Sequence, residues 1–269
     1  MPTFIPDLLQ NKVAFITGGS SGICLGIAEA FAAHGARLML LGRKQDKLDA
    51  AVATIRAGGG TAHGFAADVR NYEALEAALA KTSELYGPID ILVCGAAGNF
   101  PAPITGMSAN GFKAVVDIDL LGTFNTCRAA YPHLRKPGAS IISISANHAH
   151  QPYAYQAHVC AAKAGVDLLT QTIALEWGPE GIRANVITPG PIDDTEGMRR
   201  LAPTPEARQN AINSVPLGRM GTKQDIANLA LFLCSEAAGL INGAVLVCDG
   251  GQRLNTGRNL SLAWEASKK

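Results

Sequence analysis

The chain has 269 residues, of which 48% are hydrophobic and 17% charged, and its formal net charge is +1. This length and apolar content suit one large α/β domain, and a nearly neutral chain without a basic patch does not indicate binding of nucleic acid. No apolar run is long enough to span a bilayer, and the six cysteines show neither zinc-ligand spacing nor a disulfide framework, so we expect no membrane anchor, no bound metal and a cytoplasmic location.

The first predicted element is a buried strand, Val13–Ile16, followed by a glycine-rich turn and a helix, Ile23–His34. Strand, turn and helix in this order form the first unit of dinucleotide-binding folds. Glycines permit a tight turn and a close approach of a phosphate, which the free N–H groups at the start of the helix can bind. An ordinary βα turn that merely contains glycines is the alternative, and the strand-turn-helix context favours a cofactor site.

Strand-like apolar runs then alternate with helix-like segments, which predicts an α/β fold with a doubly wound, parallel, seven-stranded sheet of the Rossmann type and helices on both faces. The predicted strands are Val13–Ile16, Arg37–Leu41, Ala62–Ala66, Ile89–Val93, Ser140–Ile144, Arg183–Ile187 and Ala244–Val247. The predicted helices are Ile23–His34, Lys47–Ala57, Tyr72–Tyr86, Asn110–Arg135, Ala157–Trp177, Glu206–Ser214 and Lys223–Cys234. Since no linker or repeat interrupts the alternation, we expect a single domain over residues 1–269, with a substrate lid around residues 194–215.

The residues after the second and third predicted strands bear on the choice of cofactor. An acidic residue after the second strand would accept hydrogen bonds from the adenosine ribose and favour NAD, but Gly42 and Arg43 stand there instead. A guanidinium suits a 2′-phosphate, so NADP(H) is favoured over the alternative of a solvated surface arginine. Asp68, after the third strand, is either an acceptor for the adenine amino group or a cap for the next helix.

Five residues farther along carry side chains that suit a catalytic or substrate site, and all but Lys163 have a plain alternative. Phe100 either lines an apolar pocket or belongs to the core. Asp119 interrupts an apolar stretch, where a solvated helix face is the ordinary meaning, and Lys163 lies among alanines near the start of a helix. Arg199 and Arg200 follow a proline-rich loop and fit an anionic substrate, although a solvated pair is commoner.

Taken together, the motifs resemble those of the short-chain dehydrogenase/reductase family over nearly the whole chain: Thr17-Gly18 with Gly22-Ile23, Asp68-Val69, Ala96-Ala97-Gly98, Lys163, Pro189-Gly190 and Asp249-Gly250-Gly251. That family normally works with a Ser, a Tyr and a Lys. Here Val159 stands at the tyrosine position, four residues before Lys163, Ala146 at the usual serine position, and Asp119 in place of the usual asparagine. The usual proton donor to a carbonyl oxygen is therefore missing.

One subfamily shares this departure, because the chain also looks like 2,4-dienoyl-CoA reductases of the peroxisomal type in Ala96-Ala97-Gly98-Asn99-Phe100, Asp117-Ile118-Asp119, Gln156 with His158, Glu176-Trp177-Gly178-Pro179, Pro189-Gly190-Pro191-Ile192 and Thr195-Glu196-Gly197. The resemblance implies reduction of a conjugated dienoyl thioester with NADPH in the β-oxidation of unsaturated fatty acids. Hydride addition to the diene gives an extended enolate, which takes its proton on carbon. The resemblance implies that a water held by Asp119 and Lys163 supplies that proton, and that Lys163 also binds the nicotinamide ribose.

The same resemblance assigns ligand-binding roles position by position. It implies cofactor contacts from Gly18, Gly19, Ser20, Ser21, Gly22, Ile23, Arg43, Asp68, Val69, Lys163, Pro189, Gly190, Pro191, Ile192 and Thr195. It implies contacts with the acyl-CoA from Arg43, Arg70, Phe100, Ser108, Asn110 and Arg200. The chain departs from the family at Cys24, where the last turn glycine is usual, and at Cys94-Gly95, which replaces an asparagine-bearing pair.

Two other activities remain open on the residues alone. The chain could reduce a carbonyl or a 3-oxoacyl thioester with His148 or His158 as the acid, since histidine has a suitable pKa, or it could bind NADP(H) or acyl-CoA without turnover. The two long helices Asn110–Arg135 and Ala157–Trp177 carry apolar residues on more than one face, and relatives pair through them, so we expect a homotetramer. No signal peptide is expected at the start, and the end, Ser267-Lys268-Lys269, is not the Ser-Lys-Leu peroxisomal signal.

Overall fold

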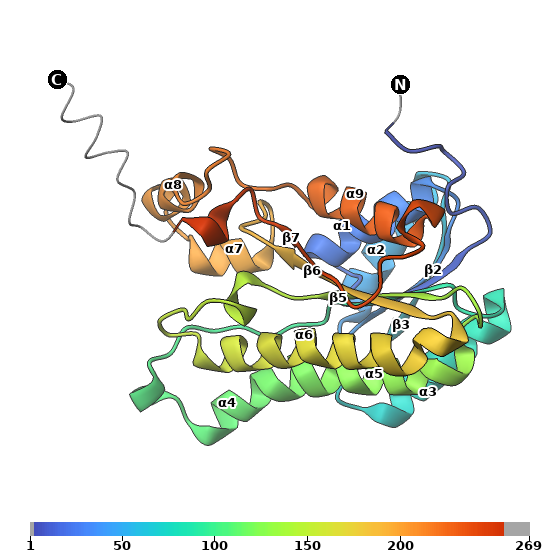
Figure 1. Cartoon of the computed structure of the whole chain (residues 1–269), viewed down its shortest axis with the longest axis horizontal. Coiled ribbons are helices and arrows are strands. Elements are labelled where there is room, and N and C mark those ends of the chain that lie inside the picture. Colours follow the sequence, from blue (N-terminus) through green and yellow to red (C-terminus); the bar gives the residue numbers. More distant parts are fainter. Residues whose placement is uncertain (1–2, 256–269) are drawn as a thin grey trace.

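The structure is a computed structural model that describes residues 3–255, and the end around Ser267 to Lys269 lies outside the described residues. Its centre is a seven-stranded parallel sheet with the order β3-β2-β1-β4-β5-β6-β7 (Figure 1). The strands are β1 (Val13–Thr17), β2 (Arg37–Gly42), β3 (Thr61–Ala66), β4 (Ile91–Cys94), β5 (Ser140–Ile144), β6 (Arg183–Pro189) and β7 (Val245–Cys248). The predicted doubly wound parallel sheet is therefore confirmed.

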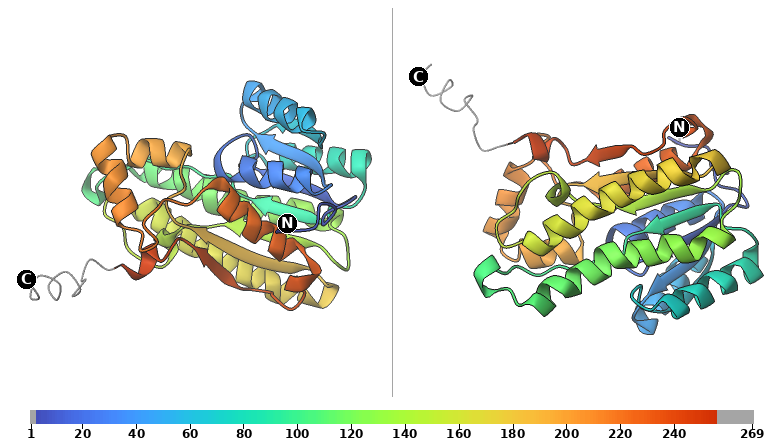
Figure 2. Two further views of the ribbon diagram at one scale, coloured as in Figure 1. Left: turned by 90° about the horizontal axis from the view of Figure 1, so that it is seen from above. Right: turned by 60° about the horizontal axis from the view of Figure 1, so that its bottom comes forward.

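Helices cover both faces of this sheet (Figure 2). One layer holds α1 (Gly22–Ala33), α2 (Gln45–Ala57) and α9 (Lys223–Cys234). The other holds α3 (Tyr72–Tyr86), α4 (Ala109–Val116), α5 (Gly122–Ala130) and α6 (Ala157–Trp177). Two short helices, α7 (Glu196–Leu201) and α8 (Pro205–Asn213), lie together at one end of the molecule (Figure 1). Among the described residues, no helix is long and apolar enough to cross a bilayer.

The two core layers follow from the alternation of side chains along the strands. In β1, Ala14 and Ile16 pack with α1, α2 and α9, whereas Val13 and Phe15 pack with the opposite layer. Successive side chains of a strand point to opposite faces, so a strand that is covered on both sides must be apolar throughout. This is why the central strands appear in the sequence as continuous apolar runs.

The structure divides the predicted helix Asn110–Arg135 into three parts. Residues Ala109–Val116 form α4, Asp117–Leu121 form a π-helical turn, and Gly122–Ala130 form α5, which a 3₁₀ turn over Tyr131–His133 follows. The prediction of one regular helix is wrong. The spacing of apolar residues continues through the π turn, so the sequence pattern does not reveal it. Such turns are rare and often occur at functional sites.

Other differences from the predicted elements are smaller. The lid segment holds α7 as well as the predicted helix, and no helix over residues 196–201 was expected. Ile89 lies before β4 and makes an isolated bridge to Leu134. Each remaining element is found within a few residues of its predicted bounds. The order of the sheet changes direction beside β1, between β1 and β4, and ligands of open α/β sheets bind outside the carboxyl ends of the strands at such a switch point.

Candidate functional site

The glycine-rich turn between β1 and α1 lies at the switch point. Gly18 and Gly22 have positive φ angles of 71° and 58°, a conformation that glycine adopts without strain. A Cβ at Gly18 would stand 2.9 Å from the carbonyl oxygen of Gly95, so the turn packs directly on the loop after β4. Ser21, at the N-cap position of α1, makes no side-chain cap. The first N–H groups of α1 therefore stay available for an anion, which fits a dinucleotide pyrophosphate.

The segment after β6 lies across this turn. The methyl carbon of Thr195 is 3.9 Å from the position of a Cβ on Gly22, so the structure brings these two predicted cofactor residues together. Gly190 packs against the backbone of Asp249, where a Cβ would come within 2.7 Å of the Cα atom. Ile192 is buried and forms a bridge with Gly221. These contacts hold the Pro189–Thr195 segment in place at the carboxyl edge.

The residues after β2 and β3 form the adenosine side of the candidate site. Arg43 is exposed and makes no hydrogen bond or ion pair with any residue in the range 3–255, so its guanidinium is available for a ligand. Asp68 accepts two hydrogen bonds from the side chain of Arg70, at 3.0 and 2.7 Å, and this pairing lowers the pKa of the carboxyl group. Arg70, predicted to bind acyl-CoA, is thus paired with a residue predicted to bind adenine. Val69 is buried against Gly122.

The two predicted catalytic residues meet in the interior. Lys163 Nζ lies 3.1 Å from Asp119 Oδ2 and donates to the carbonyl oxygen of Ile144 at 3.0 Å. Asp119 Oδ1 accepts from the backbone N–H of Gly98 at 2.7 Å. The exposed fractions are 1% for Asp119 and 6% for Lys163. The ion pair lies outside hydrogen-bond geometry, which leaves Oδ2 able to accept from a ligand or a water.

The position of the usual tyrosine is apolar in space as well as in sequence. Val159 is buried and packs with Val115 and Ala162. Tyr153 instead stacks on His148, with ring centroids 4.1 Å apart, and burial raises its pKa. Tyr155 is exposed. No phenol of the described residues therefore takes the place of the missing proton donor beside Lys163.

The two histidines near Lys163 have different surroundings. Burial and the positive charge of Lys163 lower the pKa of His148 to about 4, so this imidazole is neutral at pH 7 and a poor proton donor. His158 is fully buried on α6, and Phe100 contacts it edge-on with ring centroids 4.5 Å apart. Neither ring nitrogen of His158 has a hydrogen-bond partner among the described residues.

The predicted acyl-CoA residues gather on the side of α4. Ser108 caps α4 by accepting from the N–H of Gly111, and Asn110 is exposed on its first turn. A Cβ on Gly111 would stand 3.2 Å both from the ring of Phe100 and from Ser108 Oγ, so Phe100 lies over the start of this helix. Arg200, from the distant α7, donates to the carbonyl oxygen of Asn99 at 3.3 Å and joins the lid segment to the same loop.

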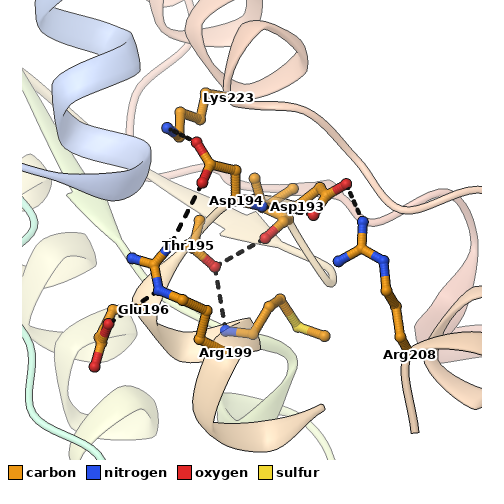
Figure 3. A network of polar contacts seen from close by, with 9 residues as sticks. Asp193, Asp194, Thr195, Glu196, Arg199, Arg208 and Lys223 are labelled. Atoms are coloured by element: carbon orange, nitrogen blue, oxygen red, sulfur yellow. Dashed lines mark hydrogen bonds and ion pairs between the residues drawn. The ribbon is translucent and has the colours of Figure 1, made fainter. Parts of the chain in front are cut away.

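The lid segment is fastened to the body by a network of charges (Figure 3). Asp194 pairs with Lys223 of α9 at 2.6 Å and with Arg199 of α7 at 3.3 Å. Asp193 pairs with Arg208 of α8. Thr195 begins α7 by accepting from the N–H of Met198 at 3.2 Å. The sequence singled out Arg199 as one of two adjacent arginines, but not Lys223 or Arg208, because exposed charges carry no periodic signal.

Other groups of the site also escape sequence reasoning. The hydroxyl of Thr17 accepts from the N–H of Gly95 at 3.1 Å, and the backbone groups of Gly98 and Ile144 hold the side chains of Asp119 and Lys163. A hydrogen bond from a backbone group does not depend on the residue type, so the sequence does not reveal it. The Thr17-Gly18 motif is a hint of the contact between Thr17 and Gly95. In the part of the chain that the structure describes, no group of three or more His, Cys, Asp or Glu could hold a metal ion.

Comparisons with known proteins find relatives over most of the chain. A sequence model of the family described as enoyl-(acyl carrier protein) reductase matches residues 18–253. The peroxisomal 2,4-dienoyl-CoA reductase of Saccharomyces cerevisiae, designated (3E)-enoyl-CoA-producing, is 44% identical over 91% of this chain and 85% of its own length. A probable 2,4-dienoyl-CoA reductase of Bacillus subtilis, designated (2E)-enoyl-CoA-producing, is 41% identical over 92% of this chain and 98% of its own.

A comparison with solved structures supports the fold. A short chain dehydrogenase from Bacillus anthracis superposes with a TM-score of 0.83 at 39% identity, over 92% of this chain and 99% of that one. The family resemblance predicted from the motifs is thereby confirmed, and with it an oxidoreductase that uses a nicotinamide cofactor. The chain belongs to the short-chain dehydrogenase/reductase family.

Proposed function

We propose that the protein is an NADPH-dependent reductase that converts 2,4-dienoyl-CoA thioesters to enoyl-CoA in the β-oxidation of unsaturated fatty acids. One observation carries the proposal: Asp119 and Lys163 form a buried ion pair at 3.1 Å, and the position where a phenol would protonate a carbonyl is the apolar Val159. A site with this pair and no phenol suits a reaction whose proton goes to carbon. The name of the yeast relative, a 2,4-dienoyl-CoA reductase, supports the same substrate class.

The residues present fit a dinucleotide. The uncapped start of α1 suits the pyrophosphate. The guanidinium of Arg43 has no partner among residues 3–255, and the neighbouring Gly42 offers no carboxylate to a ribose. A 2′-phosphate would give Arg43 a charge-assisted hydrogen bond, so we propose NADP(H) as the cofactor. When bound, the nicotinamide supplies the hydride.

The catalytic pair supplies charge and a proton route. The ammonium of Lys163 lies in a buried site, where it stabilises negative charge on the substrate more than it would in water. Asp119 Oδ2 keeps an acceptor position free, and Lys163 Nζ has donors left beyond Ile144. A water held between the two can transfer its proton to the carbon of the extended enolate, and the hydroxide that is left takes up a proton from solvent.

The acyl-CoA would lie between the loop after β4 and the lid. Phe100, Ser108 and Asn110 stand together at the start of α4, where Phe100 can contact an acyl chain. Arg43, Arg70 and Arg200 are exposed and can pair with the phosphates of CoA. We propose residues 194–215 as a substrate lid on a single domain over residues 1–269, since the contact of Arg200 with the Asn99 carbonyl joins this segment to the loop after β4.

The competing reductase of carbonyls or 3-oxoacyl thioesters would need an acid near the substrate oxygen. His148, neutral at pH 7, is poorly suited to that role. Oxidation of NADPH should therefore be measured with 2,4-hexadienoyl-CoA, acetoacetyl-CoA and a free ketone side by side. We expect turnover with the dienoyl thioester; turnover with acetoacetyl-CoA or the ketone alone would favour the carbonyl reductase, and no turnover with any of them would favour a binding protein.

Assembly and location are part of the proposal. Exposed apolar side chains lie on α4 to α6, namely Phe112, Leu121, Phe124, Leu168 and Leu175, and we propose that they are covered in a homotetramer. The cytoplasmic location stays a prediction. A fluorescent fusion distinguishes it from the peroxisome that the name of the yeast relative carries.

A further inference from the structure

The buried histidine on α6 has no partner that explains its burial. His158 has an exposed fraction of 0%, and neither Nδ1 nor Nε2 makes a hydrogen bond among residues 3–255. An imidazole carries at least one N–H in either protonation state, so at least one donor is buried without an acceptor. Buried polar groups of native proteins are nearly always satisfied. The missing partner of His158 is therefore to be sought in a bound molecule.

The position of His158 near the amino end of α6 is a second feature that suggests a bound molecule. It is the second residue of α6, a helix of 21 residues, and Gln156 at the N-cap makes no side-chain cap. Helical side chains point back toward the amino end, which places the ring of His158 beside the free N–H groups of the first turn. Both the helix dipole and these N–H groups favour negative charge at this end.

The surroundings of His158 connect it with the substrate side of the site. Phe100, proposed to contact the acyl chain, packs edge-on against it at 4.5 Å and has an exposed fraction of 37%. A ligand would have to displace the ring of Phe100 to reach His158. Lys163 lies five residues farther along the same helix, and its ion pair with Asp119 is the proposed place of the proton transfer.

We propose that His158 and the uncapped amino end of α6 bind the carbonyl oxygen of the substrate thioester. This inference rests on the proposed function and names the group that the helix end recognises. In an extended enolate the negative charge is shared between carbon and this oxygen, so hydrogen-bond donors at the oxygen stabilise the enolate more than the starting thioester. An imidazole beside a helix amino end can polarise a carbonyl in this way without giving up its proton. The proton that the enolate takes up on carbon still comes from the water between Asp119 and Lys163.

The test compares two CoA compounds of equal chain length, hexanoyl-CoA and S-hexyl-CoA, of which only the first has the carbonyl oxygen. Their dissociation constants are measured by calorimetry on the full chain saturated with NADP⁺. We expect the unaltered protein to bind hexanoyl-CoA about tenfold more tightly, the size of one good hydrogen bond. In H158L this preference should fall to less than about twofold, while binding of S-hexyl-CoA stays unchanged.

The matched control is His133→Gln, because His133 lies near the amino end of β4, away from the carboxyl ends of the strands, and its ring contacts Ser83. It should keep the full preference. Equal binding of the two compounds by the unaltered protein would overturn the inference, and this measurement needs no variant. A preference that persists in H158L, whose folding is checked by its thermal midpoint, would overturn it as well; where H158L does not fold, H158M serves.

The failure of the inference can be told apart from the failure of the proposed function. A carbonyl preference that depends on His158, together with no turnover of 2,4-hexadienoyl-CoA, would remove the reductase proposal and keep the binding site. Turnover of the dienoyl thioester without any carbonyl preference would keep the reductase proposal and remove the carbonyl-binding site. No binding of either CoA compound would contradict both.

Discussion

The sulfur of Cys24 occupies the space that a side chain at position 95 would need. A Cβ built on Gly95 would stand well under 3.0 Å from Cys24 Sγ, closer than real Cβ atoms come. The two positions at which the chain departs from its family, one on α1 and one after β4, thus fit each other. The thiol is buried, and burial raises its pKa to about 12, so it acts as a packing group rather than as a nucleophile.

This fit predicts strong coupling between the two positions. Gly95→Ala should lower the free energy of unfolding by about 1–3 kcal/mol through overpacking, and Cys24→Gly should lower it by a similar amount through the cavity it leaves. The double variant should be more stable than the sum of the single effects by at least about 1 kcal/mol. Urea unfolding of the four proteins measures this coupling, and strict additivity would mean that the two side-chain positions do not compete for space.

Arg43 should set the preference for NADPH. Because its guanidinium has no partner in the described part of the chain, Arg43→Ala should cost about 1.5–3 kcal/mol in binding of NADPH and almost nothing in binding of NADH. Dissociation constants of both cofactors, measured by fluorescence, check the prediction. Lys44→Ala, at the next and equally exposed position, is the control for a general loss of positive charge. Equal affinity of the unaltered protein for both cofactors would refute the assignment.

Asp119 should be needed for turnover and not for cofactor binding. Asp119→Asn keeps the shape of the side chain, so it should lower kcat by roughly 10²–10⁴-fold with little change in the affinity for NADPH. Asp119→Ala should do the same with an added loss of stability, because it leaves the buried Lys163 without its counter-charge. Single-turnover reduction of dienoyl-CoA gives the rate. Asp117→Asn, in the same π turn and paired with Lys113 at the surface, should remain active.

His148 should make the protein less stable in acid. Its pKa is about 4 in the folded protein, below the ordinary 6.5, because of burial and of Lys163. Between these pH values the unfolded chain takes up a proton there and the folded chain does not, so stability is lost as pH falls from about 6.5 toward 4. This one group should lower the free energy of unfolding by about 2 kcal/mol between pH 7 and pH 5.

The contribution of His148 is isolated by comparing the unaltered protein with His148→Gln in urea at both pH values. Other groups, such as His63, whose pKa is also lowered by burial, remain in both proteins and cancel. The variant should lose clearly less stability on acidification. An identical loss would mean that His148 titrates normally in the folded state.

The exposed apolar residues of α4 to α6 should be covered by another copy of the chain. Sedimentation at micromolar concentration should show a tetramer, and a Leu168→Glu, Leu175→Glu double variant should shift the distribution toward smaller species, because it places charges on the exposed face of α6. Leu240→Glu, at a still more exposed leucine outside these helices, serves as a charge control for that face. A monomer in the unaltered protein would refute the proposal.

The sequence by itself determined the sheet, the glycine-rich turn and the missing phenol. Buried strands and amphipathic helices are coded by local periodicity, so their alternation predicted a parallel sheet covered on both faces. The turn glycines could be located from residue types at fixed spacing, and the resemblance to the family showed that Val159 stands where a tyrosine is usual.

Only the tertiary structure decided which groups meet. The pairing of Asp119 with Lys163 joins residues 44 positions apart and depends on how the π turn packs against α6. The sequence does not reveal this turn, because its altered hydrogen-bond pattern leaves the spacing of the apolar residues intact. The fit of Cys24 to Gly95 and the missing partner of His158 depend on burial and distance across helices and loops. Such contacts arise from packing between elements far apart in the chain, which local patterns do not encode.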